Sequence, residues 1–469
     1  MRKFICIFIT VLLGVCSVTA QEFIAMNSEG LNFHYKVINA NTNEVELVGN
    51  DAYVNYSGEV NIPDTLEFNG MKYTVTQLGN RAFVYCKDIA SVTLPNTVRT
   101  IGASAFRGCS ALQSIKLSEN LITIENNAFD GCRNLLSIMF PNTLKSIGNE
   151  VFHNCSGLIS LVIPNSVQMI GQAAFSYCTK VMSVIVGEGI TRISKDAFVN
   201  CVSLVSVTLN NSLAIIGENA FCNCKSLPSI MLPNSLVKIE NNAFLESGLM
   251  SIEIPNLVVS LGDYAFKECK NLTSAVLGNA VTTIGRQAFW GCCNLQSVTM
   301  GNAVNWIKNG AFSNCENLTS ITIPPMVTKI DELAFSEDKN LKTVYWNAKN
   351  LVNYATNKEY FHPFYKTPVE VVVFGNEVQT IPMNAFMNCE VMNTVVIENA
   401  VTSIGAGAFK NCVGLKQLTM KAAVPSKIDK TTFEKIDVKI PVMVPCDAVK
   451  SYQEHVDWKY FENIQCEEK

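Results

Sequence analysis

Cysteine is the residue type in this sequence whose number and regular spacing suggest that its side chains could take part in chemistry. The chain has 469 residues and 18 cysteines. Twelve of them recur at one point of a repeated segment, for example "NAFDGC" at Asn127 to Cys132. A cysteine can be a nucleophile, a metal ligand, half of a disulfide or a small buried apolar group. The twelve are Cys86, Cys109, Cys132, Cys155, Cys178, Cys201, Cys224, Cys269, Cys292, Cys315, Cys389 and Cys412.

The partners that nucleophilic or metal chemistry needs are scarce. The chain has 4 histidines and no H-E-x-x-H motif, whereas zinc sites combine cysteine with histidine or pair C-x-x-C motifs. The close cysteine pairs, Cys222-x-Cys224 and Cys292-Cys293, fit neither pattern. A cysteine and a histidine that meet only in the fold are the alternative, which no spacing favours. We therefore expect no catalytic residue, no metal and no cofactor.

The cysteines belong to a repeat of 23 residues. A phenylalanine stands three residues before each of them, and ten of the eleven steps from Phe83 to Phe335 are 23 residues long. One unit, Leu204 to Cys224, reads L-x-S-[IV]-x-[LIV], a turn, [VL]-x-x-I-G and then A-F-x-x-C. Its first part predicts a short strand. We expect A-F-x-x-C to form one helical or 3₁₀ turn on the opposite wall, and the Ile-Gly glycines to allow a tight bend or a left-handed backbone.

Stacked units of this length bury a continuous core, because one unit cannot bury its apolar face alone. About fifteen coils, ~4.8 Å apart, predict a solenoid roughly 70 Å long. Equivalent cysteines would point the same way with Cβ atoms ~4.8 Å apart, whereas a disulfide needs about 3.8 Å. Ser247 and Asp338 replace the cysteine in two coils. We expect buried, unpaired thiols.

The segment "SIKLSENLITIENNAFDGC", from Ser114 to Cys132, resembles the BspA-like leucine-rich repeats of bacterial cell-surface proteins. The resemblance covers about residues 72 to 420. It implies a strand-rich α/β leucine-rich-repeat solenoid, wound as a right-handed superhelix. It also implies a secreted or surface-exposed protein, since some members are implicated in adhesion to host matrix proteins or to other cells.

Four regions are expected along the chain. Residues 1–20 have a basic start, an apolar run and small residues before Ala20, which is typical of a secretory signal peptide. Lipidation of Cys16 is the alternative, although Val15 stands where a small residue is usual. Residues 21–71 alternate like antiparallel strands and predict an N-terminal β cap. Residues 72–424 form the solenoid, with an irregular coil at 346–368, and 425–469 form a C-terminal cap.

The C-terminal cap is predicted to be helical. Apolar residues recur near helical spacing in its last part, and Cys446 and Cys466 flank that part. These two cysteines are a candidate disulfide in an oxidising compartment. The spaced residues are Val449, Tyr452, Val456, Phe461 and Ile464.

Charge and hydropathy exclude two classes of partner. Loss of Arg2 and Lys3 with the signal peptide would change the net charge from -4 to -6. An acidic chain without a basic run is not expected to bind nucleic acid or an anionic membrane. No later segment is long and apolar enough to predict a transmembrane helix. We expect export to the periplasm, the cell surface or the extracellular space.

Two places could bind a partner. One is a solvent-facing column of the strands, in which many residues are apolar; the alternative is that β-branched residues simply suit an exposed strand. The other is the irregular coil, with Tyr360, Phe364 and Tyr365; there the alternative is that Phe361 or Phe364 replaces the missing core phenylalanine. The column candidates are Met139, Val162, Ile185, Thr208, Met231, Val276, Thr299 and Tyr345.

The sequence therefore favours a non-enzymatic binding protein, secreted or surface-exposed. Its solenoid face would bind a protein or a glycan on a host or neighbouring cell, in protein–protein contact or adhesion. The alternative is a carbohydrate-binding or structural protein of the cell envelope that uses the aromatic cluster of the irregular coil.

Overall fold

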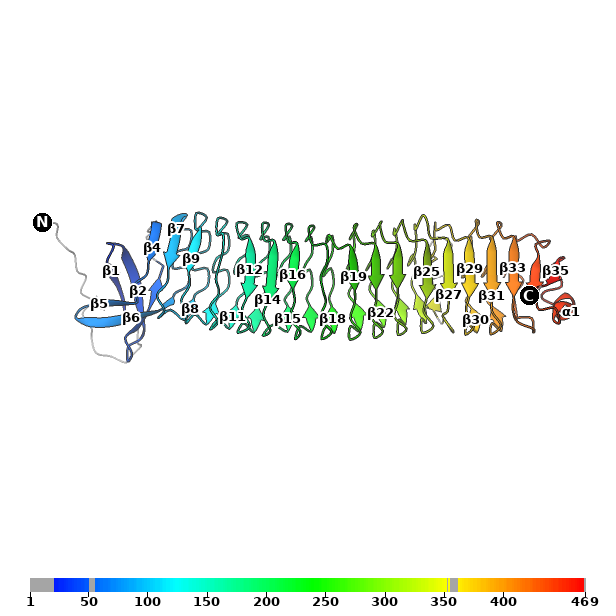
Figure 1. Cartoon of the computed structure of the whole chain (residues 1–469), viewed down its shortest axis with the longest axis horizontal. Helices are drawn as coiled ribbons and strands as arrows, with labels where there is room; N and C mark the ends of the chain where they lie inside the picture. Colours follow the sequence, from blue (N-terminus) through cyan, green and yellow to red (C-terminus); the bar gives the residue numbers. More distant parts are fainter. Residues whose placement is uncertain (1–20, 50–54, 352, 355–361, 468–469) are drawn as a thin grey trace, which may run out of the picture.

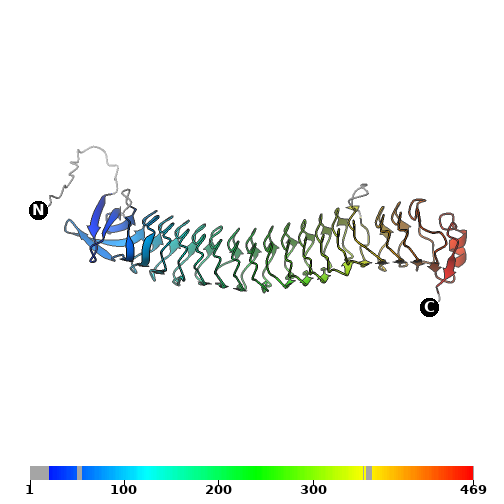
Figure 2. The same cartoon turned by 90° about the horizontal axis from the view of Figure 1, so that it is seen from above.

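The chain forms an elongated, gently curved solenoid of about 17 turns, rich in strands and almost free of helix (Figures 1 and 2). The computed structural model describes residues 21–49, 55–351, 353–354 and 362–467. The predicted signal peptide, Cys16 and Tyr360 lie outside the described residues. The count of turns exceeds fifteen because β4 (Ser57–Asn61), β34 (Val442–Val444) and β35 (Ile464–Cys466) stack onto the repeat without an A-F-x-x-C of their own.

One wall of the solenoid consists of parallel strands, many of which begin at the repeated serine. Their side chains alternate between exposed and buried, as in Ser160–Ile163, so the apolar residue after the serine enters the core. The coils at 137–139 and 229–231 follow this path without forming a strand. The strands of this wall, with β4, β34 and β35, are β7 (Asp88–Thr93), β9 (Ser114–Lys116), β12 (Ser160–Ile163), β14 (Ser183–Val186), β16 (Ser206–Thr208), β19 (Ser251–Glu253), β21 (Ser274–Val276), β23 (Ser297–Thr299), β25 (Ser320–Ile323), β27 (Thr343–Trp346), β29 (Val371–Phe374), β31 (Thr394–Ile397) and β33 (Gln417–Met420).

A second wall consists of two-residue strands, most of which end at the repeated isoleucine that glycine follows in several coils. They pair in parallel from coil to coil, for example Ile124 with Ile147. These strands are β8 (Thr100–Ile101), β10 (Thr123–Ile124), β11 (Ser146–Ile147), β13 (Met169–Ile170), β15 (Arg192–Ile193), β17 (Ile215–Ile216), β18 (Lys238–Ile239), β20 (Ser260–Leu261), β22 (Thr283–Ile284), β24 (Trp306–Ile307), β26 (Lys329–Ile330), β28 (Asn353–Tyr354), β30 (Thr380–Ile381) and β32 (Ser403–Ile404).

The A-F-x-x-C wall consists of tight turns, not of the single helical or 3₁₀ turn that the sequence predicted. Asn219 and Asn223 have φ of 54° and 61°, so two left-handed residues interrupt any helix. The N–H of Phe221 donates to the carbonyl of Ala243 in the next coil at 2.8 Å, whereas the N–H of Cys222 bonds back to Asn219. Alternate N–H groups thus join neighbouring coils, which a helix would not allow.

The glycines of the Ile-Gly pairs are required by close approach and not by a left-handed backbone. A Cβ added to Gly171 would lie 2.4 Å from the nitrogen of Asn149, and one added to Gly285 would lie 2.3 Å from the oxygen of Gly262. Neither glycine has a positive φ. Of the two alternatives that the sequence left open, a tight bend or a left-handed backbone, the left-handed backbone is excluded at these positions. The preceding coil leaves no room for a side chain, which accounts for the glycines.

The core is a column of sixteen stacked phenylalanine rings that runs from Phe83 to Phe433. Neighbouring ring centroids lie 5.1 to 6.1 Å apart and the rings are nearly parallel. Phe33 and Tyr56 pack edge-on against Phe83 at one end. Trp458 packs on Phe433 at the other end. Aromatic rings that the repeat does not predict therefore cover both ends of the column.

The N-terminal residues form a small sheet in which strands pair mainly antiparallel. β6 continues this sheet into β8 of the second wall, so the sheet and the solenoid share one run of hydrogen bonds. The strands are β1 (Glu22–Met26), β2 (Asn32–Asn39), β3 (Glu44–Val48), β5 (Thr65–Phe68) and β6 (Met71–Leu78).

The C-terminal segment is not the helical cap that its apolar spacing predicted. The described part contains one short helix there, α1 (Val449–Glu454), and β34 and β35 pair in parallel on either side of it. Val456, expected on the apolar face, is exposed, whereas Trp458 is fully buried. The chain must return from β34 to β35 within 20 residues, so strand pairing overrides the helical spacing. None of the helices in the described ranges is long and apolar enough to cross a bilayer.

Candidate functional site

The repeated cysteines point into the core and donate hydrogen bonds to it. The Sγ of ten of them lies 3.0 to 3.3 Å from the carbonyl oxygen of the phenylalanine one coil earlier, as Cys201 does to Phe175. Burial raises the pKa of the Cys201 thiol to about 12, although the neighbouring backbone opposes this shift. A thiol that stays protonated and buried is a poor nucleophile and a poor metal ligand. These cysteines therefore build the scaffold.

The same slot accepts other side chains that can hydrogen-bond. In the irregular coil Thr367 takes the place of cysteine, and its hydroxyl donates to the carbonyl of Phe335 at 2.6 Å. In the coil before it, Asp338 accepts the N–H of Cys315 at 2.7 Å. Burial raises the pKa of the Asp338 carboxyl well above its ordinary value, and the Cys315 hydrogen bond only partly opposes this.

The irregular coil does not present Phe364 to a ligand, which corrects its place among the candidate binding residues. Phe364 is 1% exposed and lies between Phe335 and Phe386, with centroids 5.1 and 5.3 Å away. It is the core phenylalanine of this coil, as the simpler hypothesis held. Tyr365 is half-buried. The aromatic cluster is thus smaller than the sequence suggested.

The strand wall does expose the predicted column. Met139 and Met231 are the extremes, 86% and 87% exposed. The threonines Thr208 and Thr299 are exposed as well. The remaining candidates, Val162, Ile185, Val276 and Tyr345, are all exposed large apolar side chains.

A second exposed apolar column, which the sequence analysis missed, runs along the other side of the serines. Its members directly precede the serine, and five of them are exposed large apolar residues: Leu136, Ile159, Met182, Val205 and Met250. If side chains alternated strictly between core and solvent from the buried leucine of the repeat, the residue after the leucine would face solvent and the serine would face the core. The strand begins only at the serine, however, so both residues face solvent. We call the exposed residues of both columns and the serines between them, from Leu136 to Met250, the apolar strand face.

The apolar strand face carries no charge along its length. In its two columns and in the serines between them, every side chain from Leu136 to Met250 is uncharged. The first charges in line with the column of Met139 and Met231 are Lys116 on one side and Glu253 on the other, and both are exposed. A charged small molecule would find no counter-charge here. An apolar and hydroxyl-bearing surface of this kind suits contact with another protein.

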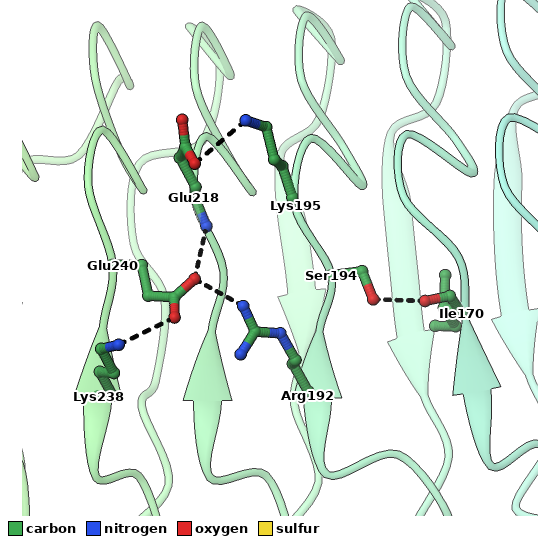
Figure 3. Close-up of polar contacts among 7 residues, drawn as sticks. All are labelled: Ile170, Arg192, Ser194, Lys195, Glu218, Lys238 and Glu240. Carbon is green, nitrogen blue, oxygen red and sulfur yellow. Dashed lines mark hydrogen bonds and ion pairs between the residues drawn. The ribbon is translucent and has the colours of Figure 1, made fainter.

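Charged side chains gather instead along the second wall, where they neutralise one another (Figure 3). Glu240 lies 2.6 Å from Arg192 and 3.1 Å from Lys238, and it accepts the backbone N–H of Glu218 at 3.2 Å. Burial raises the pKa of Glu240, but the Lys238 hydrogen bond and the Arg192 charge outweigh burial and hold this pKa below its ordinary value. Lys195 in turn pairs with Glu218 at 3.1 Å. This network satisfies its own charges and joins successive coils.

One column on the turn wall has the residue types of a hydrolase but not the access. Asp130, His153 and Ser176 occupy the same slot in successive coils, and His153 Nδ1 lies 2.7 Å from the Ser176 hydroxyl. Arg107 pairs with Asp130 at 3.0 Å. Ser176 is only 1% exposed, so a substrate cannot reach its oxygen. Elsewhere in the described ranges, no group of three histidine, cysteine or acidic residues is placed to hold a metal ion.

At the C-terminal end, Cys446 and Cys466 form a disulfide with Cα atoms 4.4 Å apart. Cys466 ends β35 and pairs there with Val444, the last residue of β34, and Cys446 follows two residues later, so the sheet register brings the two cysteines together. The disulfide closes the chain around α1 and lies far from the apolar strand face (Figure 1).

The geometry of the repeat agrees with comparisons to known proteins. The family model for the BspA type leucine rich repeat region matches in overlapping segments, with six copies, that together run from residue 76 to residue 454. A solved leucine-rich repeat protein from Bacteroides ovatus aligns over 93% of this chain and 98% of its own, with 24% identity and a TM-score of 0.57. No curated protein matches this chain.

Two further solved structures align with lower TM-scores. A leucine rich cell surface protein from Faecalibacterium prausnitzii covers 95% of both chains with 21% identity and a TM-score of 0.37. The leucine-rich repeat protein of T. pallidum covers 46% of this chain and 91% of its own, with 28% identity and a TM-score of 0.37. Leucine-rich-repeat solenoids of this kind are generally non-enzymatic binding proteins.

Proposed function

This chain belongs to the BspA-type leucine-rich-repeat family, and from that premise we propose that it is a secreted or surface-exposed protein whose apolar strand face binds another protein. The basic and apolar start of the sequence supports export. Adhesion to a host or neighbouring cell is the role that we propose for this contact.

The observation that carries the proposal is the continuous, uncharged apolar strand face. Large side chains such as Met139 and Met231 are almost fully exposed, which costs free energy in water unless a partner covers them. Methionine adapts its shape to a partner, and aligned serine hydroxyls can hydrogen-bond to one.

The partner that fits is a protein with an uncharged, largely apolar docking surface. An acidic or basic ligand would lose its hydration on this face without gaining a counter-charge. A glycan would need polar groups and an exposed aromatic ring. Phe364 is buried, so the aromatic cluster of the irregular coil has one ring fewer for this role. Protein binding is therefore favoured over carbohydrate binding.

Biolayer interferometry against purified matrix and cell-surface proteins tests the proposal. The triple variant Met139→Ser, Ile185→Ser and Met231→Ser should weaken an identified partner by about tenfold or more, because it removes exposed apolar area at the centre of the face. Unchanged affinity in this variant would contradict the proposal.

A matched control uses exposed methionines outside the face. Met326 and Met383 are 54% and 51% exposed, and both lie outside the long strands of the first wall. Met326→Ser with Met383→Ser should leave the affinity unchanged. An equal loss of affinity in both sets of variants would indicate non-specific hydrophobic binding, which would also contradict a specific binding face.

A further inference from the structure

The apolar strand face has an internal symmetry about Ile185. The three-stranded sheet β12-β14-β16 lies at its centre, with Ile185 in the middle strand. On each side follows one coil without a regular strand, at 137–139 and at 229–231. Each of these coils presents one methionine, and the two are almost equally exposed, 86% and 87%.

The charges that bound this column are opposite and equally far from the centre. Lys116 lies three coils before Ile185, and Glu253 lies three coils after it. Both side chains are exposed, and neither makes an ion pair with any residue in the described ranges. Read in order, the column is Lys116, Met139, Val162, Ile185, Thr208, Met231 and Glu253.

A surface of this kind complements a second copy of itself. A two-fold axis parallel to the strands and through Ile185 reverses the order of the coils but keeps the position along each strand. Lys116 of one copy then faces Glu253 of the other, and Met139 faces Met231. Ile185 faces its own copy on the axis.

We propose that the partner of the apolar strand face is a second copy of this chain, packed face to face with the two solenoids antiparallel and centred on Ile185. This inference rests on the proposed function, because it assigns the partner of the same face. Two Lys116–Glu253 pairs fix the register, and the two apolar columns interdigitate as between stacked sheets.

The small area of the face limits the affinity of this dimer. Seven coils and about four residues along each strand give roughly 34 Å by 13 Å. This area is below the ~800 Å² per partner of a standard stable interface. The dimer should therefore form in a concentration-dependent way, and a dilution series is the appropriate measurement.

Sedimentation equilibrium of the mature chain, from about 5 to 500 µM, tests the inference. Lys116→Glu alone and Glu253→Lys alone should each raise the dissociation constant by about tenfold, because each places like charges opposite one another. The double reversal, Lys116→Glu with Glu253→Lys, should restore the native value to within about threefold. A chain that stays monomeric at 500 µM, or single reversals without effect, would overturn the inference.

Cross-linking tests the register independently. The variant Ile185→Cys should form an intermolecular disulfide under mild oxidation, because only a residue on the axis meets its own copy. Val162→Cys alone should not cross-link, whereas Val162→Cys together with Thr208→Cys should do so. Equal cross-linking of Ile185→Cys and Val162→Cys would overturn the proposed axis.

These experiments also distinguish failure of the proposed dimer from failure of the proposed binding function, on which the dimer rests. If the chain is monomeric but the methionine and isoleucine substitutions still weaken a different protein partner, the second copy is wrong and the binding face stands. If neither a dimer nor a partner responds to those substitutions, the binding face itself fails.

Discussion

At the scale of single residues, the slot three positions after each stacked phenylalanine governs local stability. Most coils fill it with a cysteine whose thiol bonds to the preceding coil. Asp338 fills it with a carboxyl that is fully buried, and its Oδ2 has no hydrogen-bond partner in the described part of the chain. A buried ionisable group that is only partly hydrogen-bonded destabilises a fold.

Asp338 gives a prediction about pH. The folded state raises the pKa of this carboxyl well above its ordinary value, so its contribution to stability is complete below about pH 4 and is lost as the pH rises. Asp338→Asn should therefore raise the free energy of unfolding at pH 7, by roughly 1–3 kcal/mol. The gain should shrink toward pH 4. Urea unfolding at both pH values measures it, and a constant gain would contradict the assignment to ionisation.

The thiols give a second prediction at this scale. Ten cysteines donate to backbone carbonyls in the core, so they should be reduced even when the protein is kept in an oxidising buffer. Titration of the denatured, unreduced protein should therefore find at least ten thiols, and the native protein should react far more slowly. Four or fewer thiols after denaturation would show that neighbouring coils are cross-linked.

At the scale of elements, the sequence predicts the features that recur in every repeat. It misjudges features that depend on contact with a neighbouring coil or strand. The 23-residue period is enough to place the strand at Ser206 and the buried ring at Phe221, because both follow from apolar spacing. The Ile-Gly glycines could serve a left-handed turn or a close approach, and only the distance to the preceding coil distinguishes the two. The C-terminal segment forms only the short helix α1, because strand pairing across 20 residues is not apparent from local periodicity.

The candidate site shows the same limit. Alternation counted from the buried residue after the serine predicts that Met139 and Met231 are exposed but turns Ile159 and Met182 inward, whereas the structure exposes all four. The strand begins only at the serine, so the alternation does not extend to the residue before it. Phe364 was ambiguous because a missing A-F-x-x-C could mean a free ring or a substitute core ring, and the stack decides for the core.

The disulfide between Cys446 and Cys466 gives a prediction about the C-terminal element. It closes a loop of 20 residues, so loss of the cross-link should cost this segment about 3 kcal/mol in the chain-entropy picture. In a solenoid the loss should stay local, because each turn contacts only its neighbours. Cys446→Ser should increase hydrogen exchange in β34, α1 and β35. Exchange near Gly171 serves as the control, and a uniform increase over the whole chain would contradict a local role.

At the scale of the whole molecule, we expect a weak junction in the solenoid between the turns of Phe335 and Phe386. Asp338 lies in this junction with an unsatisfied oxygen. His362 is buried there as well, its Nδ1 has no partner in the described ranges, and burial lowers its pKa to about 4. In the described part of the chain, β28 ends one sheet of the second wall and β30 begins another, as β13 and β15 also do. Two buried polar groups with an unsatisfied atom thus lie in adjacent turns.

A repeat array unfolds at its weakest interface first, so this junction should divide the molecule into two cooperative units. We expect urea unfolding in two steps, with residues after about 370 losing hydrogen-exchange protection before the middle of the solenoid. Asp338→Cys, which restores the common occupant of the slot, should move the first step to higher urea and bring the two steps together. Asp196→Asn, at a half-buried position of the turn wall far from the junction, is the control and should leave both steps in place, because an amide oxygen can still accept the Asn219 hydrogen bond. A single transition in the native chain, followed by tryptophan fluorescence and exchange alike, would show that the stacked core outweighs the junction.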